Sequence, residues 1–299
     1  MSDVSPRQVL TQVARAVPAE CRENIIIVGS LAAGFLLLTG EMGFQVRTKD
    51  IDCVLSPRIE AVSAGTAIAD KLLASGWTAR LTGKHARPGN AETPDDQLPV
   101  VRLYPPDSVD WFIELLTVPD PNQNEKRAWM RMELSSGHYG LPSFRFMALA
   151  AFQPKLTDLG IYCARPAMMV LANLLEHPRI GPELMEGPIE GRKIKRTNKD
   201  LGRVLAIARL SSEQDMALWP GAWQEALLAC FPQDARSLAE GAGRGLRALL
   251  GGEPDLEEAL WTCNNGLLAQ LPLTLERLRL TGERLMLDAI EPIEGWGRS

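Results

Sequence analysis

The chain has 299 residues, a formal net charge of −5 at pH 7, 45% hydrophobic residues and 23% charged residues. These values are close to those of an average globular protein, and the length suits two domains better than one. The acidic balance argues against non-specific binding of nucleic acid over the whole surface.

No segment has the features of a membrane span or a targeting signal. The longest apolar run, near Leu31–Leu38, is broken by glycines and is far shorter than the roughly 20 residues that a spanning helix needs. The N-terminal residues lack a signal-peptide pattern, so we expect a cytoplasmic protein with no membrane partner. Five scattered cysteines without CxxC spacing predict reduced thiols instead of a disulfide framework or a zinc site.

The first 145 residues alternate between helical and extended patterns. Residues 5–19 have apolar positions at helical spacing, and the run "NIIIVGS" is typical of a buried strand that ends in a turn. We expect a helix over "LAAGFLLL", a strand over "KDIDCVLSP", and a helix over residues 58–76 that stops at Gly76. Three more strands are expected around the polar loop of residues 84–97: "WTARLTG", "LPVVRLYPP" and "SVDWFIELLTVP".

The pattern changes near residue 146, after which helical periods dominate and strand-like runs are nearly absent. The sequence therefore predicts an α/β (α+β) domain over residues 1–145, with a short mixed sheet flanked by helices. A mostly α-helical domain over residues 146–299 follows, and it includes an exposed loop rich in glycine, proline and charge at residues 177–199.

The chemistry of the chain is concentrated in "IIIVGS…RTKDID". Asp50 and Asp52 are two residues apart in a predicted strand, so their side chains share a face. Two neighbouring carboxylates repel unless a cation lies between them, and a hard dication is the usual solution. Gly29 and Ser30 stand where a strand leads into a helix, a position that favours phosphate binding. A divalent ion beside a phosphate site is what nucleotidyl or phosphoryl transfer requires.

Other interpretations of these residues are available. A DxD pair by itself is more often a solvated strand end than a metal site. A P-loop is unlikely because Phe35 and Leu36 stand where Lys and Ser or Thr should follow the glycines, and no GxGxxG motif is present. The Gly-Ser pair one strand earlier, together with the charged "RTKDID" segment, favours the metal site.

The order "VGSLAAGFLL…RTKDIDCVL" resembles the signature of the DNA polymerase β-type nucleotidyltransferase superfamily. The resemblance implies that Asp50 and Asp52 hold Mg²⁺ or Mn²⁺. It also implies that Gly29 and Ser30, with Thr48 before the aspartates, bind an NTP such as ATP.

A third carboxylate on a later strand usually completes the metal site in that superfamily. The candidates here are Glu114, which we prefer as a metal ligand and catalytic residue, and Asp110, roughly 13 Å away along the predicted strand. Only one of the two can belong to the site, and a Glu there departs from the usual Asp.

The second half resembles AbiEii-like, type IV toxin and related stand-alone nucleotidyltransferases. Lys199-Asp200-Leu201 matches their Lys-Asp-Leu motif, whereas Asn173 stands where a Lys is expected in an earlier helix. The resemblance implies catalytic roles for Lys199 and Asp200, and nucleotide binding by Lys195, Arg196 and Lys199. It also implies a tRNA acceptor and a cognate antitoxin protein as partner.

From the residues alone, the basic cluster "GRKIKRTNKD" is equally well explained as a solvated loop, and Asp200 as a residue favoured by a helix dipole.

Three functions follow from these patterns. The first is metal-dependent transfer of NMP from an NTP to a hydroxyl on RNA, a protein or a small molecule. The second is a catalytically inactive nucleotidyltransferase fold that binds a nucleotide or a partner, which the departures at Glu114 and Asn173 favour. The third and weaker one is a phosphotransferase, which would release ADP instead of pyrophosphate.

Overall fold

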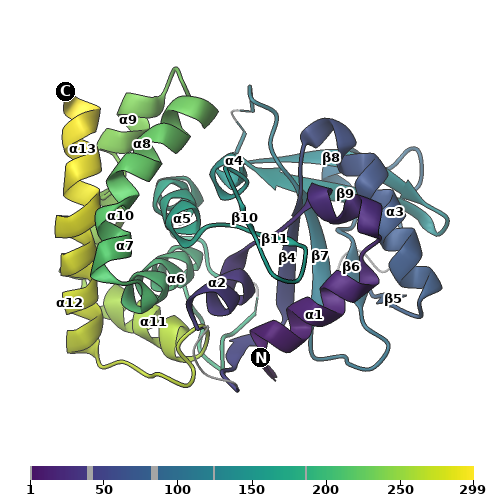
Figure 1. Ribbon diagram of the computed structural model, residues 1–299, viewed down its shortest axis with the longest axis horizontal. Coiled ribbons are helices and arrows are strands. Elements are labelled where there is room, and N and C mark those ends of the chain that lie inside the picture. Colours follow the sequence, from purple (N-terminus) through teal and green to yellow (C-terminus); the bar gives the residue numbers. More distant parts are fainter. Residues whose placement is uncertain (1, 39–42, 82–86, 124, 186) are drawn as a thin grey trace. The chain divides into compact units, whose positions relative to one another are not determined.

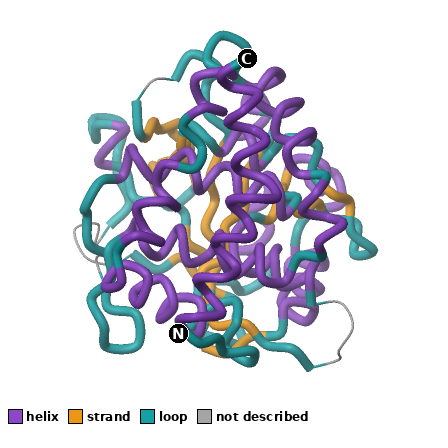
Figure 2. The backbone as a smooth tube through the Cα atoms, turned by 90° about the vertical axis from the view of Figure 1, so that its left-hand side faces the viewer, coloured by secondary structure: helices purple, strands orange, loops and turns teal. Residues whose placement is uncertain are grey.

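The computed structural model describes residues 2–38, 43–81, 87–123, 125–185 and 187–299. These residues divide into two compact units. The sheet unit consists of Ser2–Ala32 and Thr48–Ala164, and the helical unit consists of Ala33–Arg47 and Arg165–Ser299. Helices account for more of the chain than strands do, as Figure 2 shows.

Within the described residues, seven strands form the mixed sheet of the sheet unit, in the order β10-β11-β2-β4-β7-β6-β5 (Figure 1). Their bounds are Ile25–Ile27 (β2), Asp50–Leu55 (β4), Thr78–Ala79 (β5), Arg102–Tyr104 (β6), Phe112–Thr117 (β7), Lys155–Leu156 (β10) and Tyr162–Cys163 (β11). The central strand β4 is antiparallel to β2 and parallel to β7. In β2 all three isoleucines are buried, so both faces of this strand are covered, which explains its continuous apolar run.

The helices of the sheet unit begin and end at recognisable signals. Their bounds are Pro6–Ala16 (α1), Gly29–Leu37 (α2), whose last residues lie in the helical unit, Ala61–Ala74 (α3) and Met147–Ala150 (α4). Helix α1 begins where Ser5 Oγ accepts a hydrogen bond from the Gln8 N–H, with Pro6 in its first position. Helix α3 is followed by Gly76, whose φ of +87° is a left-handed conformation that glycine adopts without strain.

A hairpin that the sequence did not predict completes the sheet unit. It consists of β8 (Arg127–Leu134) and β9 (Gly137–Phe144), and α3 packs against β8. The short strands Ser2–Val4 (β1) and Val46–Thr48 (β3) lie outside the large sheet. Residues 82–86 of the chain, which include the start of the predicted polar loop, lie outside the described residues, and Asp95–Gln97 form a 3-10 turn.

The division between the units differs from the predicted boundary at residues 145 and 146. The sheet unit continues to Ala164 because β11 pairs in parallel with β2, and β10 pairs with β11 at the edge of the sheet. These strands are two residues long, which is too short for an alternating pattern to be visible in the sequence.

The helical unit confirms the predicted change of pattern after the sheet. Its helices are Pro166–Ile180 (α5), Arg196–Leu210 (α6), Glu213–Ala217 (α7), Trp219–Cys230 (α8), Ala235–Glu240 (α9), Arg244–Gly251 (α10), Glu253–Asn264 (α11), Leu275–Leu285 (α12) and Glu291–Arg298 (α13). A π-helical turn over Met286–Ile290 joins α12 to α13. Helix α6 packs against α5, α11 and α12, and its residues Leu201, Val204 and Leu205 are buried.

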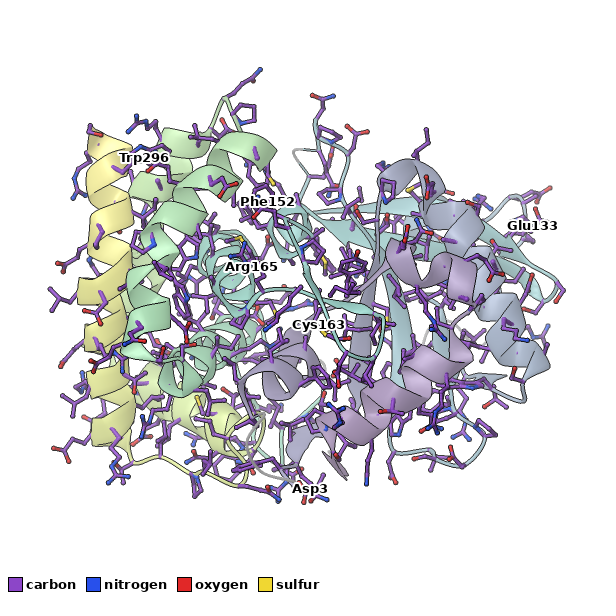
Figure 3. The ribbon with its side chains drawn as sticks, viewed as in Figure 1. Asp3, Glu133, Phe152, Cys163, Arg165 and Trp296 are labelled. Atoms are coloured by element: carbon purple, nitrogen blue, oxygen red, sulfur yellow. The ribbon has the colours of Figure 1, made fainter. Side chains whose placement is uncertain are left out.

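The five cysteines, all within the described part of the chain, are free thiols as predicted. Cys163 lies on β11 (Figure 3), and burial raises the pKa of its thiol to about 12. None of the described helices is long and apolar enough to cross a membrane.

A buried carboxylate joins α10 to α13 in the helical unit. The Glu294 side chain is only 3% exposed, and its Oε1 accepts hydrogen bonds from the Gly243 N–H (2.9 Å) and Arg247 Nη1 (2.7 Å). Burial alone would raise the pKa of the Glu294 carboxyl, but these hydrogen bonds outweigh burial and lower it below its ordinary value. The charged form of Glu294 therefore stabilises the fold.

We expect the contribution of Glu294 to stability to depend on pH. Because the folded pKa is lowered, the contribution is present above the unfolded pKa of about 4.3 and is lost as the pH falls through the folded pKa. Glu294→Gln should therefore lower the melting temperature at pH 7, with a loss of about 1–3 kcal/mol, and the gap to wild type should narrow in acid. Thermal melts from pH 7 to pH 3 test this. Glu283→Gln, on the exposed face of α12, is the control, and an equal gap at every pH would contradict the expectation.

Candidate functional site

The Gly-Ser pair lies beside one of the two predicted aspartates. Strand β2 ends at Ile27, α2 begins at Gly29, and the Val28 N–H donates to the Asp52 carbonyl oxygen at 3.0 Å. Gly29 has a φ of +79°, and a Cβ atom at this position would lie 3.4 Å from Asp52 Oδ2. Only glycine adopts this φ without strain, so the turn brings the first residues of α2 next to the Asp52 carboxylate.

Both predicted aspartates lie on one face of the sheet. In β4, Asp50 and Asp52 are half-buried, whereas the alternating residues Ile51 and Cys53 are fully buried. Thr48 Oγ1 donates a hydrogen bond to Asp50 Oδ1 at 2.9 Å, which orients that carboxylate. The predicted strand and the shared face of the two carboxylates are therefore confirmed in the geometry of β4.

The neighbouring strand adds a third carboxylate to the same face. In the parallel pair of β4 and β7, Asp52 is the direct partner of Glu114, and paired residues of neighbouring strands point to the same side. Asp110 does not lie on this strand, contrary to the prediction, because β7 begins only at Phe112. It occupies an exposed bend in which its N–H donates to Ser108 Oγ at 3.1 Å.

Glu114 is bound by an arginine that the sequence analysis did not identify. Arg102, on β6, is the direct antiparallel partner of Glu114, and Arg102 Nε donates to Glu114 Oε2 at 2.6 Å. Burial alone would lower the pKa of the Arg102 guanidinium, but the charge of Glu114 and the hydrogen bond to it outweigh burial and raise that pKa, with Asp50 adding to the effect. The sequence did contain a signal for Arg102, because it is the one charged residue inside the apolar run "LPVVRLY".

The described residues contain no group of three or more His, Cys, Asp or Glu side chains arranged to hold a metal ion. The predicted trio of Asp50, Asp52 and Glu114 therefore does not form a ready three-carboxylate centre. Asp50 and Asp52 remain the pair that suits a Mg²⁺ ion, because this ion commonly takes one or two protein carboxylates and completes its shell with water and substrate phosphates.

The predicted basic residues belong to the helical unit, where part of their charge is already paired. Lys195 precedes the first residue of α6, and Lys195 Nζ lies 2.6 Å from Asp255 Oδ1 on α11. The hydrogen bond with Asp255 raises the pKa of Lys195, and the same bond lowers the pKa of Asp255. Asn198 Nδ2 bonds both Asp255 (2.8 Å) and Glu258 (3.0 Å). The charge of Lys195 is thus compensated within its own unit.

The other predicted residues of this segment lie along the first turns of α6. Helix α6 begins at Arg196, three residues before Lys199, so the Lys-Asp-Leu motif follows the helix start instead of forming it. Arg196, Lys199 and Asp200 are half-buried, and among the described residues neither Arg196 nor Lys199 forms an ion pair. Asn173, on α5, donates from Nδ2 to the Met169 carbonyl at 2.6 Å, so its amide bonds its own helix.

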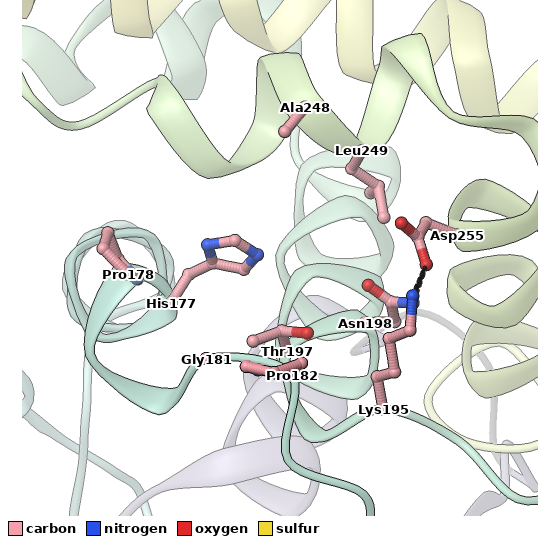
Figure 4. Close-up of a pocket in the computed structure, with 10 residues that line it drawn as sticks. All are labelled: His177, Pro178, Gly181, Pro182, Lys195, Thr197, Asn198, Ala248, Leu249 and Asp255. Carbon is pink, nitrogen blue, oxygen red and sulfur yellow. Dashed lines mark hydrogen bonds and ion pairs between the residues drawn. The ribbon is translucent and has the colours of Figure 1, made fainter.

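A pocket of about 280 Å³ lies within the helical unit (Figure 4). His177 of α5 faces it from one side, the Lys195–Asp255 pair closes another, and Leu249 of α10 lies across from Thr197. Burial lowers the pKa of the His177 imidazole, although Asp200 and Asp255 oppose the shift, and this favours the uncharged form. The pocket therefore offers no uncompensated cation on its described lining that would suit a triphosphate.

Comparison with family models, curated proteins and solved structures found no match to this chain. The functional assignment therefore depends on the residues and geometry described above.

Proposed function

We propose that this protein is a metal-dependent nucleotidyltransferase that transfers NMP from an NTP to a hydroxyl acceptor. The observation that carries the proposal is the contact between the glycine turn and the carboxylates. Helix α2 begins at Gly29, where an added Cβ atom would lie 3.4 Å from Asp52 Oδ2, and Asp50 lies on the same face of β4 as Asp52. This arrangement supports a phosphate site at the start of α2 next to a dication site at the two aspartates.

The proposed reaction is a single displacement at the α-phosphorus of the NTP. The oxygen of the acceptor hydroxyl bonds to the α-phosphorus of the NTP, the bond from that phosphorus to the bridging oxygen breaks, and pyrophosphate leaves. The hydroxyl proton passes to a carboxylate of the site, and the N–H groups at Gly29 and Ser30 bind phosphate oxygens. Asp50 and Asp52 would hold Mg²⁺ or Mn²⁺, which supplies positive charge to the reacting phosphate when bound.

The helical unit is the proposed source of acceptor selection. Arg196 and Lys199 have no ion-pair partner among the described residues, so they keep more charge than Lys195 for binding phosphates of a nucleotide or RNA. The fold by itself does not name the acceptor. The classes to test are RNA 3′ ends such as those of tRNA, proteins and small molecules, and a cognate antitoxin is a proposed protein partner.

A second function is favoured by two specific contacts. Glu114 is bound to Arg102, and the amide of Asn173 is bound to its own helix, so two positions expected to serve catalysis have other partners. These contacts support an inactive nucleotidyltransferase fold that binds a nucleotide or a partner protein without turnover.

Incubation with α-³²P-labelled NTPs distinguishes the two functions. The purified protein is mixed with Mg²⁺ or Mn²⁺, each NTP in turn, total tRNA and a protein extract. We expect label on one acceptor class together with release of pyrophosphate. Label on no acceptor, with nucleotide binding retained in a separate assay, would favour the binding module, and release of ADP would indicate phosphoryl transfer instead.

A further inference from the structure

Four residues from neighbouring elements form a continuous row across one face of the sheet. Gly29 lies beside the Asp52 carboxylate, since a Cβ added to Gly29 would be 3.4 Å from Asp52 Oδ2. Asp52 pairs with Glu114 in register, and Glu114 pairs with Arg102. Neighbouring strands are about 4.8 Å apart, so the Cα atoms of Asp52 and Arg102 are roughly 10 Å apart. The row therefore ends in a cation, and a substrate that is bound at the carboxylates and extends along the row would reach it.

The guanidinium of Arg102 is held at one end and open at the other. Its Nε donates to Glu114 Oε2 at 2.6 Å, and its Cζ lies 5.3 Å from the centre of the Phe112 ring. Its two Nη groups form no hydrogen bond or ion pair with any described residue, and the side chain is 40% exposed. An arginine fixed through Nε presents both Nη groups as a fork, the geometry that binds two phosphate oxygens.

Arg102 contributes positive charge to a face of the sheet that is otherwise negative. Asp50, Asp52 and Glu114 contribute three carboxylates, and a polyphosphate would be repelled by them without cations nearby. Arg102 shares this face with Asp52 and Glu114, so its guanidinium is the positive group beside these carboxylates.

We infer that Arg102 is a phosphate-binding residue of the proposed nucleotide site and that Glu114 is its positioning residue instead of a third metal ligand. This inference rests on the proposed function for the identity of the phosphate-bearing ligand. A dication bound to Glu114 would lie beside a guanidinium that already bonds the same carboxylate, and two cations at that separation repel. Glu114, which stands where the resemblance implies an Asp, thus positions Arg102 and does not bind the metal ion.

Calorimetric titration with an α,β-methylene analogue of ATP, which cannot transfer NMP, tests the inference without turnover. The proteins are the full chain, Arg102→Gln, Glu114→Gln, the double variant and Arg102→Lys. Arg80→Gln is the matched control, because Arg80 lies over the neighbouring Tyr104 ring and has no bond to Glu114. Binding of Mn²⁺ to each protein without nucleotide is measured by electron paramagnetic resonance, and melting curves verify folding.

The two assignments of Glu114 predict different results. If Glu114 positions Arg102, Arg102→Gln and Glu114→Gln should each weaken binding of the analogue about tenfold. The double variant should bind the analogue with about the same affinity as the weaker-binding of these two single variants. Arg102→Lys should recover part of the loss, Arg80→Gln should stay within about twofold of wild type, and Mn²⁺ affinity should change by less than about twofold.

Three results would overturn the inference. They are a loss of Mn²⁺ affinity of about tenfold or more in Glu114→Gln, additive losses in the double variant, or failure of the wild-type chain to bind the analogue. The proposed function fails separately, through the absence of NMP transfer while the analogue still binds. A fourth result, NMP transfer by the wild type with no effect of Arg102→Gln on analogue binding, would overturn the inference and leave the proposed function standing.

Discussion

Asp52→Asn is expected to lower NMP transfer by about 10³-fold while the protein stays folded. The amide keeps the size of the side chain but removes the negative charge beside the N-terminus of α2, and a neutral amide is a weaker ligand for a hard dication. The backbone of Asp52 still accepts the hydrogen bond from Val28, so β2 and β4 should remain paired. Label transfer from an α-³²P NTP, together with a thermal melt, measures both effects.

Asp110→Asn is the matched control for this variant. It makes the same chemical change in the same unit, but Asp110 lies in an exposed bend before β7. Transfer should stay within about twofold of wild type, since removing a solvated surface charge has little effect on a distant site. Equal losses in the two variants would make Asp110 a member of the site. Full activity of Asp52→Asn would remove the carboxylate pair from the proposed mechanism.

A large expected effect on stability comes from Gly202, where α6 and α11 approach closely. A Cβ atom at Gly202 would lie 2.1 Å from Thr262 Oγ1 and 2.8 Å from the Ala259 carbonyl oxygen. The hydroxyl can rotate away, but the carbonyl belongs to the backbone of α11 and moves only if the helices separate. Gly202→Ala should therefore destabilise the fold by about 1–3 kcal/mol, although alanine favours helix by about 1 kcal/mol over glycine.

Gly221→Ala makes the same substitution in α8, where no atom lies within 4 Å of the added Cβ. Here only the helix preference acts, so the melting temperature should rise, by the equivalent of up to about 1 kcal/mol. Chemical denaturation of both variants compares the two changes directly. Shifts in the same direction would show that helix preference, and not the contact between α6 and α11, determines the effect at Gly202.

Local patterns in the sequence were sufficient for the central elements of the fold. The apolar run at residues 25–28 predicted β2, the Gly-Ser turn predicted the start of α2, and the alternation around Asp50 and Asp52 predicted β4. The hairpin of β8 and β9 was missed. One face of β8 carries charged and aromatic side chains, such as Arg127, whose Cζ lies 4.1 Å from the centre of the Trp129 ring. This mixture does not give the apolar pattern that predicts a strand.

The contacts of the site residues depend on register between strands that are far apart in the chain. Glu114 on β7 pairs with Asp52 on β4, which is 62 residues earlier in the chain, and with Arg102 on the neighbouring strand β6. The spacing of these residues in the sequence does not predict either pairing. The same holds for Lys195, whose partner Asp255 lies 60 residues away on α11.

The sequence by itself determined which residues could perform the chemistry, because the turn at Gly29 and the alternation of Asp50 and Asp52 are local properties of the backbone. Only the tertiary structure decided which charges are already paired. Glu114 is bound by Arg102 and Lys195 by Asp255 because the packing of strands and helices brings them within hydrogen-bond distance. These pairs occupy the Glu114 carboxylate and the Lys195 ammonium, whereas Arg102 is bound only through its Nε.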